Sequence, residues 1–160
     1  VQGLASMVGF WLTGLPALAD DSGVEVEALG GQPGVDSAAY AGPQRDPEAN
    51  NRKLLDALGG SPNRRARFRC VLALAGPGFP PATVEGCCEG VITHEPRGRH
   101  GFGYDPIFIP DGFTQTFAEL PSEVKNRISH RGRALRAALE AWGPVLRAAA
   151  TRTPPRPSTP

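Results

Sequence analysis

The strongest constraint on the fold is a run of alternating side chains, RRARFRCVLALAG, at residues 64–76. Small or apolar side chains occupy every second position, and arginines stand between them in the first half. Because successive side chains of a strand point to opposite faces, this pattern predicts a long strand with one buried and one solvated face. The buried face is predicted to hold Ala66, Phe68, Cys70, Leu72 and Leu74, and the solvated face Arg65, Arg67 and Arg69.

Three further segments predict strands around it. TVEGCCEGVIT (83–93) is expected to pair with the long strand through turns around residues 77–81, and GYDPIFIP (103–110) is expected to form a short strand after a glycine loop. PALADDSGVEVEALGG (16–31) predicts a strand, a sharp turn at Asp20–Gly23, and a second strand with one wet face.

Two segments predict helices. RDPEANNRKLLDALGG (45–60) has Asp46 at the N-cap, Pro47 at the first helical position and glycine after the end. SHRGRALRAALEAW (129–142) begins with Ser129 as the cap. Its buried stripe is predicted to be Leu135, Leu139 and Trp142. The order of elements predicts one mixed α/β domain over residues 1–143 and a proline-rich, disordered tail over 144–160.

Composition excludes several classes of function. With 17 basic and 16 acidic residues the net charge is +1, so no overall field favours nucleic acid or a membrane surface. The apolar stretch at residues 7–12 is too short to span a bilayer and is not expected to be a signal peptide. Three cysteines, without C-x-x-C spacing, fit neither a disulfide framework nor a zinc site. We expect them to be buried reduced thiols in a cytoplasmic protein.

One candidate site is the acidic group Asp20-Asp21-Ser22-Gly23. Paired carboxylates can hold Mg²⁺ and orient or deprotonate a water molecule, because hard oxygen ligands suit that ion. The alternative is an ordinary turn whose side chains cap their own backbone.

A second candidate is HGFGYDPIF at residues 100–108. Gly101 and Gly103 would let the backbone approach a ligand, Phe102 could stack on a flat ring, and Asp105 could accept hydrogen bonds. A glycine-relieved turn leading into a strand explains the same residues.

A third candidate is KNRISHR, in which Lys125, His130 and Arg131 supply donors around a helix start. A solvated basic face is the alternative. Together the three groups offer metal carboxylates, an aromatic ring and cationic donors, which suits a nucleotide. No P-loop, Rossmann fingerprint or G-x-S-x-G motif occurs. An RNA-binding strip of Arg65, Arg67 and Arg69 is a weaker hypothesis, because alternate arginines on a strand more often form a solvated face.

Five segments resemble the inosine triphosphate pyrophosphatase family (Ham1-like, non-canonical purine NTP pyrophosphatases). They are ALADDSGVEVEALGGQPGVDSAAYAG, NNRKLL, RARFRCVLAL, GFGYDPIFIP and FAELPSEVKNRISHRGRAL, in order between Thr13 and Leu139. The resemblance implies a long mixed sheet flanked by helices, with two lobes and a nucleotide cleft between them. It also implies hydrolysis of ITP, dITP and XTP to the monophosphate and pyrophosphate with Mg²⁺, by a cytoplasmic homodimer that binds neither nucleic acid nor membrane.

The resemblance also implies roles for single residues. Asp21 would be the general base and, with Asp20, a metal ligand. The residues expected to contact the nucleotide are Ser22, Phe102, Gly103, Tyr104, Asp105, Lys125, His130 and Arg131.

The chain departs from the family pattern in three places. Members begin with a strand and a T/S-G-N-x-x-K loop for the triphosphate, followed by a helix with a metal-associated glutamate. LTGLP (12–16) does not match that loop, VQGLASMVGFW (1–11) does not resemble that helix, and Ala39 stands where relatives usually carry arginine. We therefore expect an N-terminally truncated chain, and the alternative to an active enzyme is an impaired remnant that only dimerises or binds purine nucleotides.

Overall fold

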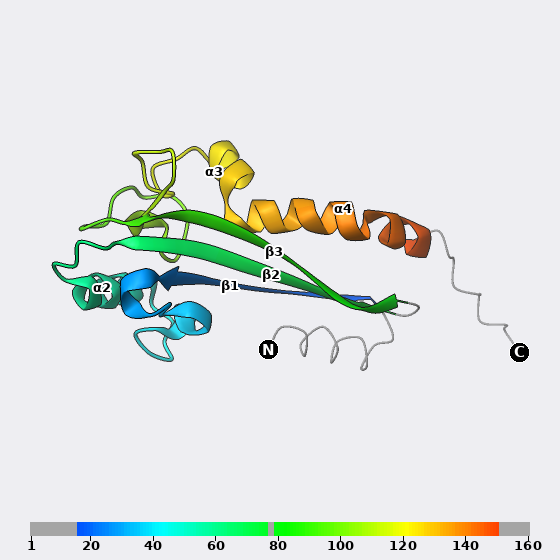
Figure 1. Ribbon diagram of the computed structural model, residues 1–160, viewed down its shortest axis with the longest axis horizontal. Helices are drawn as coiled ribbons and strands as arrows, with labels where there is room; N and C mark the ends of the chain where they lie inside the picture. The colour runs from blue at the N-terminus through cyan, green and yellow to red at the C-terminus, as the bar shows by residue number, and fades with distance from the viewer. Residues whose placement is uncertain (1–15, 77–78, 151–160) are drawn as a thin grey trace, which may run out of the picture.

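The computed structural model describes residues 16–76 and 79–150. Its centre is an antiparallel sheet of β1 (Ala17–Val26), β2 (Arg65–Gly76), β3 (Phe79–Ile92) and β4 (Phe108–Pro110), in that order across the sheet (Figure 1). Helices flank this sheet, so the predicted α/β class is confirmed. Within the described ranges every strand pairing is antiparallel.

The alternation that predicts β2 is confirmed. Its apolar side chains are buried, and its arginines form ion pairs along the opposite face. Arg67 Nε lies 2.6 Å from a Glu25 oxygen, and Arg69 Nη2 lies 2.6 Å from a Glu85 oxygen. Because carboxylates pair with these arginines, the strand does not offer a row of free positive charges to phosphate groups. The structure therefore does not support the RNA-binding hypothesis.

The turn predicted at Asp20–Gly23 is wrong. β1 runs without interruption from Ala17 to Val26, and Ser22 pairs with Cys70 in the ladder to β2. In the ladder with β2, the backbone N–H and C=O groups of this segment form hydrogen bonds. These hydrogen bonds stabilise the strand more than the turn preference of Asp, Ser and Gly disfavours it. Side chains of Asp20 and Asp21 therefore point to opposite faces of the sheet.

The strands after β2 are placed as expected but differ in length. β3 starts at Phe79, earlier than predicted, and pairs with β2 over most of its length. β4 covers only Phe108–Pro110, because Asp105–Ile107 forms the short 3₁₀ helix η3.

The first predicted helix is confirmed as α2 (Pro47–Leu58). The Asp46 carboxylate accepts hydrogen bonds from the backbone N–H groups of Glu48 and Ala49, and the Gly59 N–H closes the other end on the Leu55 carbonyl. Two 3₁₀ helices, η1 (Glu27–Leu29) and η2 (Gly34–Ala39), connect β1 to this helix.

The C-terminal helices are α3 (Ser122–Ile128) and α4 (His130–Ala150). Ser129 caps α4 as predicted, since its Oγ accepts a hydrogen bond from the Gly132 N–H at 3.2 Å. The predicted stripe is wrong in part: Trp142 is buried, but the side chains of Leu135 and Leu139 are 52% and 67% exposed. Ala134 and Ala138 face the sheet instead, because α4 lies close to the strands and only small side chains fit there.

Helix α4 also continues past residue 143, with Pro144 inside it. Residues 151–160, most of the predicted tail, lie outside the described residues. None of the described helices is long and apolar enough to cross a membrane. Cys70 and Cys88 are buried free thiols as expected, whereas Cys87 is only half-buried.

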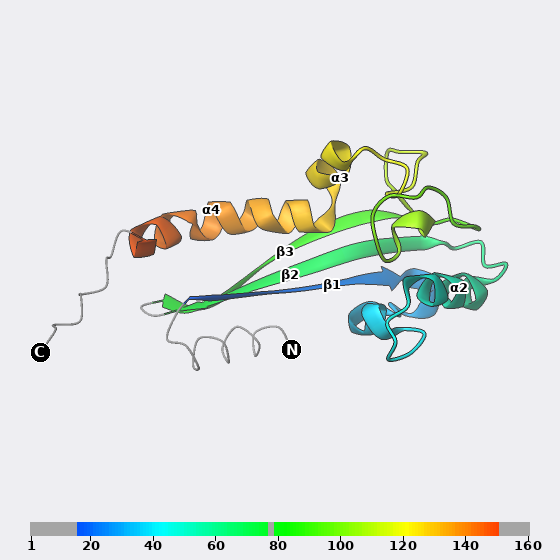
Figure 2. The same ribbon diagram turned by 180° about the vertical axis from the view of Figure 1, so that it is seen from behind.

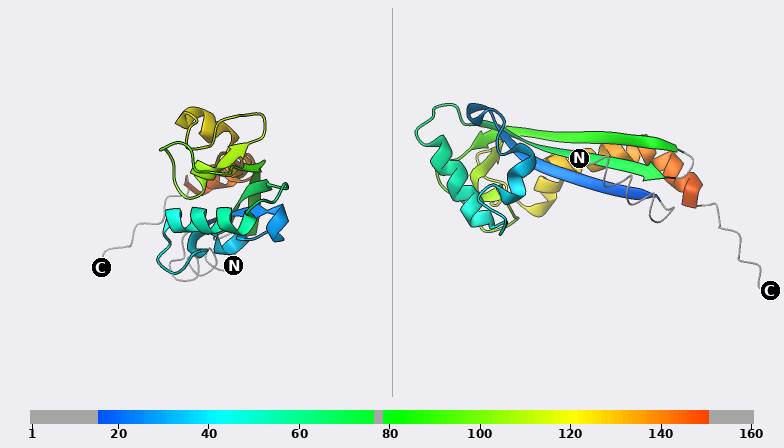
Figure 3. Two further views of the ribbon diagram at one scale, coloured as in Figure 1. Left: turned by 90° about the vertical axis from the view of Figure 1, so that its left-hand side faces the viewer. Right: turned by 90° about the horizontal axis from the view of Figure 1, so that it is seen from below.

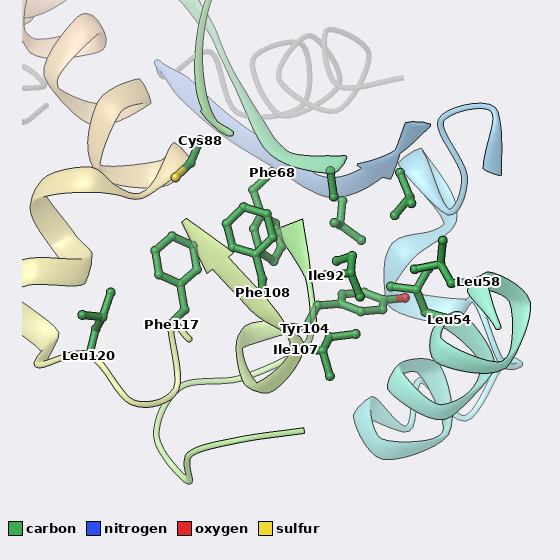
Figure 4. Packing of buried hydrophobic residues seen from close by; sticks show 13 residues of the cluster. Leu54, Leu58, Phe68, Cys88, Ile92, Tyr104, Ile107, Phe108, Phe117 and Leu120 are labelled. Atoms are coloured by element: carbon green, nitrogen blue, oxygen red, sulfur yellow. The ribbon is translucent and has the colours of Figure 1, made fainter. Parts of the chain in front are cut away.

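The buried residues form two clusters. The larger lies at one end of the sheet, where Leu54 and Leu58 of α2 pack near Phe68, Phe108 and other apolar side chains (Figure 4). The smaller lies under α4, which runs along one face toward the other end of the sheet (Figure 2). Seen end-on, α2 lies toward the β1 edge of the sheet and α3 toward the β4 edge (Figure 3, left).

Candidate active site

A cavity of about 340 Å³ opens at the end of the sheet beside the larger cluster. Its floor comes from β1 and β2, and its walls come from the η2–α2 segment, from the loop before η3 and from the first residues of α4. It brings together predicted site residues that are far apart in the sequence: Ser22, Phe102, Gly103, Tyr104, Asp105, His130 and Arg131.

The loop before η3 displays an aromatic ring. Gly101 and Gly103 have φ angles of 81° and 62°, which side-chain-bearing residues rarely adopt. A Cβ on Gly101 would also lie 2.1 Å from Asp105 Oδ2. Between the two glycines, the side chain of Phe102 is 63% exposed. The loop thus holds the ring at the cavity, as its sequence predicts.

The side chain of Asp105 holds this loop in place through hydrogen bonds. Its carboxylate is buried, and Oδ2 accepts hydrogen bonds from the Phe102 N–H at 2.7 Å and from Lys125 Nζ. Lys125 Nζ also lies 4.7 Å from the centroid of the Phe102 ring. Lys125 is not among the residues lining the cavity, so the structure places it behind the ring as an ion-pair partner.

Tyr104 ties the loop to the opposite wall. Its buried hydroxyl donates a hydrogen bond of 2.8 Å to the Ser37 carbonyl on η2. Burial raises the pKa of the Tyr104 hydroxyl, so it stays neutral and remains a donor. This contact fixes the distance between the loop and η2.

His130 lies in the cavity as a neutral imidazole. Its ring stacks on Phe68 with centroids 4.7 Å apart and planes 8° from parallel. Burial lowers its pKa to about 4, and the positive charges of Arg131 and Lys125 add to this effect. Nδ1 is buried without a hydrogen-bond partner in the described part of the chain. A ligand donor or acceptor would satisfy it.

Ser22 Oγ, on the cavity floor, is the second buried polar atom there without a well-formed hydrogen bond to described residues. It faces the thiol of Cys70, whose pKa is raised by burial, while the neighbouring Ser22 hydroxyl acts in the opposite sense. A thiol is a weak hydrogen-bonding group, so this hydroxyl is available to a ligand.

The two predicted metal carboxylates are not brought together. Asp20 forms an ion pair of 3.3 Å with Arg131 at the cavity rim. Asp21 lines a separate hollow of about 70 Å³ on the opposite face, with Glu25 and Arg69. No three acidic, histidine or cysteine side chains gather as a metal site among residues 16–76 and 79–150. Each carboxylate could supply one ligand to an Mg²⁺ ion that is held mainly by phosphate oxygens.

Sequence reasoning did not identify the α2 residues that shape the site. Asn50 Oδ1 accepts from the Ala41 N–H at 2.6 Å, and its amide nitrogen reaches the Ala38 carbonyl at 3.1 Å. Asn51 Nδ2 donates to the Gly103 carbonyl at 3.1 Å. Two adjacent asparagines inside a helix are the available signal, because asparagine disfavours helix interiors unless its side chain has another partner. Arg45 also lines the cavity and was not predicted.

The model of the Ham1 family matches residues 5–141. The chain belongs to this family. It is 58% identical over 130 residues to the dITP/XTP pyrophosphatase of Desulforamulus reducens, covering 80% of this chain and 65% of that protein. It is 59% identical over 122 residues to the enzyme of the same name from Syntrophobacter fumaroxidans, covering 76% and 53%. The chain therefore spans somewhat less than two thirds of the length of these relatives.

Solved structures of the Ham1 family have the same fold. The Staphylococcus aureus Ham1 protein superimposes with a TM-score of 0.86 at 40% identity, covering 89% of this chain and 74% of that one. A HAM1 protein from Coxiella burnetii gives a TM-score of 0.78 at 45% identity, covering 82% and 69%.

Proposed function

We propose that the chain hydrolyses non-canonical purine nucleoside triphosphates, ITP, dITP and XTP, to the monophosphate and pyrophosphate. The observation that carries this proposal is the cavity that joins the displayed ring of Phe102 to the donors of His130 and Arg131. The names of the Ham1-family relatives, dITP/XTP pyrophosphatases, support the same reaction.

The base occupies the cavity at the loop before η3. Phe102 stacks on the purine, while Val24 and Phe68 form an apolar floor. The Arg131 guanidinium carbon lies over the Phe102 ring, 5.2 Å from its centroid, so a base that displaces it from the ring would remain within reach of its N–H donors. Arginine has donors only, and therefore it pairs with the O6 acceptor of hypoxanthine or xanthine but not with the 6-amino group of adenine.

The triphosphate extends toward the other face of β1. Gly23 lines both the cavity and the smaller hollow of Asp21, so only the backbone of β1 separates the two. Asp21 accepts the proton of the attacking water, whose oxygen bonds to the α-phosphorus as pyrophosphate leaves. Mg²⁺ is the proposed cofactor, and Asp21 or Asp20 would supply its protein ligand; because their side chains point to opposite faces of the sheet, one ion would not bind both. When bound, it neutralises phosphate charge.

We also propose an oligomeric state and a cellular location for the chain. We propose a homodimer, which the family resemblance supports. A cytoplasmic location is in line with the free thiols of Cys70, Cys87 and Cys88. No nucleic acid or membrane partner is needed for hydrolysis of a free nucleotide.

Pyrophosphate release from ITP, XTP and ATP in the presence of Mg²⁺ tests the function. We expect kcat/KM for ITP and XTP to exceed that for ATP by roughly a hundredfold or more, because a donor facing the adenine amino group is left unpaired. Asp21→Asn keeps the size of the side chain but removes the base, so turnover should fall about a hundredfold or more.

The matched control is Asp36→Asn, which changes an exposed carboxylate of η2 that lines neither hollow. Near-normal turnover by Asp21→Asn would remove Asp21 from the mechanism. Binding of IMP without any pyrophosphate release by the unaltered chain would contradict the hydrolase and leave the nucleotide-binding remnant.

A further inference from the structure

Arg45 is a cavity residue with an unusual backbone. It precedes the N-cap of α2, and its φ of 55° is the only positive value of a non-glycine residue in the described ranges. Its N–H donates to the Gly42 carbonyl at 3.2 Å, and the Asp46 cap with Pro47 fixes the chain on its other side. Left-handed backbone in a residue with a long side chain is uncommon and is held by its surroundings. The start of the Arg45 side chain is therefore firmly placed at the cavity wall.

The guanidinium of Arg45 is not committed to another protein group. In the part of the chain that the structure describes, it forms no ion pair and no side-chain hydrogen bond. The other cation lining the cavity, Arg131, is paired with Asp20. The neighbouring Asp46 carboxylate faces backbone N–H groups of α2. Arg45 thus offers a set of free N–H donors to whatever enters the cavity.

Arg45 and Arg131 reach the cavity from different sides. Arg45 precedes α2, which packs beside β1 at Val24 and Val26, and Arg131 lies at the start of α4, which packs on Cys70 and Leu72 of the same sheet face (Figure 1). A purine that stacks on Phe102 with its O6 toward Arg131 would turn its C2–N3 edge toward the α2 wall. The substituent at C2 would then lie on the side of the cavity that Arg45 lines.

The C2 substituent is what distinguishes guanine from the proposed substrates. Xanthine carries an oxygen acceptor at C2, hypoxanthine carries only hydrogen, and guanine carries an amino donor. All three have O6, so donors at the O6 end cannot separate guanine from the other two. A donor-only group at C2 pairs with xanthine, is indifferent to hypoxanthine and leaves both partners unpaired with guanine.

We propose that Arg45 reads the C2 position of the base, binding the xanthine oxygen and disfavouring guanine. The assignment rests on the proposed function, because it places a purine in the cavity. It makes Arg45 a specificity-determining residue on the wall opposite the O6 donors.

The test measures dissociation constants of IMP, XMP and GMP for the 160-residue chain by titration calorimetry, with AMP measured on the unaltered chain as the reference for base selection. Monophosphates need no turnover, so binding of the base is measured directly. Arg45→Ala should weaken XMP by roughly tenfold, because a charged hydrogen bond is lost, leave IMP within about twofold, and tighten GMP. Arg45→Gly should give the same pattern, since glycine adopts the φ of 55° freely and removes only the side chain.

Two control variants accompany it. Arg52→Ala removes an exposed arginine of α2 that does not line the cavity and should change none of the three constants. Phe102→Ala should weaken all three alike, since stacking does not depend on the edge of the base.

Equal weakening of IMP, XMP and GMP by Arg45→Ala would show that Arg45 contacts ribose or phosphate, and unchanged constants would show that it contacts nothing; either result overturns the assignment. Failure of the unaltered chain to prefer IMP and XMP over AMP would instead overturn the proposed function, and the assignment with it.

Discussion

At the scale of the residue, burial determines what His130 can do. The imidazole is 5% exposed and lies against Phe68, and its pKa of about 4 keeps it neutral at physiological pH. A neutral ring has one donor and one acceptor nitrogen, so it can match a base edge without adding charge to a site that already holds Arg131.

The lowered pKa makes the stability of the fold depend on pH. The unfolded chain takes up a proton at His130 below about pH 6.5, whereas the folded chain does so only near pH 4. Stability is therefore complete above the first value and falls as the pH decreases toward the second. Between pH 7.5 and pH 5 we expect a loss of about 2 kcal/mol from this group.

His130→Phe keeps an aromatic ring against Phe68 and removes the titration. Urea unfolding at pH 7.5 and pH 5 should show a smaller decrease for this variant than for the unaltered chain. The comparison cancels the carboxylates that both proteins share. Equal decreases in the two proteins would show that His130 does not titrate as its burial indicates.

Sequence reasoning predicts single residues well where local chemistry decides their role. Phe102 between two glycines and the Asp46 cap follow from properties of the chain within a few residues. The ion pair of Asp105 with Lys125 and the position of Arg45 in the cavity join segments distant in sequence. No local pattern encodes which distant side chains meet, so these could not be predicted.

At the scale of the element, the contact of α4 with β3 places His130 and Arg131. A Cβ on Gly86 of β3 would lie 2.2 Å from the His130 carbonyl oxygen and 2.3 Å from the Ala134 nitrogen. Both are backbone atoms of the first turns of α4, which cannot move aside as the end of a flexible side chain can. Gly86 thus permits the close approach that sets the height of α4 above the sheet.

Gly86→Ala should push the start of α4 away from β3. We expect a loss of roughly 1–3 kcal/mol in the free energy of unfolding from overpacking, together with weaker IMP binding. Chemical denaturation and calorimetry measure the two effects. Gly60→Ala is the matched control, because nothing lies within 4 Å of its added Cβ; its stability should stay within about 0.5 kcal/mol. Equal stabilities of the two variants would contradict the close contact.

The same contact explains why the sequence mispredicts the buried face of α4. Leucines are the usual residues of a buried stripe, so the sequence favours Leu135 and Leu139 at the buried face. The short distance set by Gly86 favours Ala134 and Ala138 at the interface and leaves the leucines exposed. In β1, pairing with β2 likewise overrides a local turn signal. Strand patterns and helix caps are readable from sequence, whereas the distance between packed elements is not.

At the scale of the whole molecule, the cavity belongs to one end of an extended structure. The larger cluster, with Leu54 and Phe68, lies beside the cavity (Figure 4), and the smaller one, with Leu72 and Trp142, lies between α4 and the strands. The two clusters share the continuous strands β2 and β3 but have separate sets of buried side chains. Parts of a protein that have separate sets of buried side chains often unfold locally and independently of each other.

Hydrogen exchange of backbone amides tests this division. Trp142→Phe and Leu54→Val each remove part of a buried side chain and should cost about 1 kcal/mol where they act. We expect Trp142→Phe to speed exchange roughly fivefold at the amides of Leu72 and Leu74. The exchange rate at the Phe68 amide and the affinity for IMP should stay unchanged. Leu54→Val should do the reverse, speeding exchange near Phe68 and weakening IMP. If both variants sped exchange equally at all three amides, the sheet would open as one cooperative unit, and the cavity would depend on the packing under α4 as much as on α2.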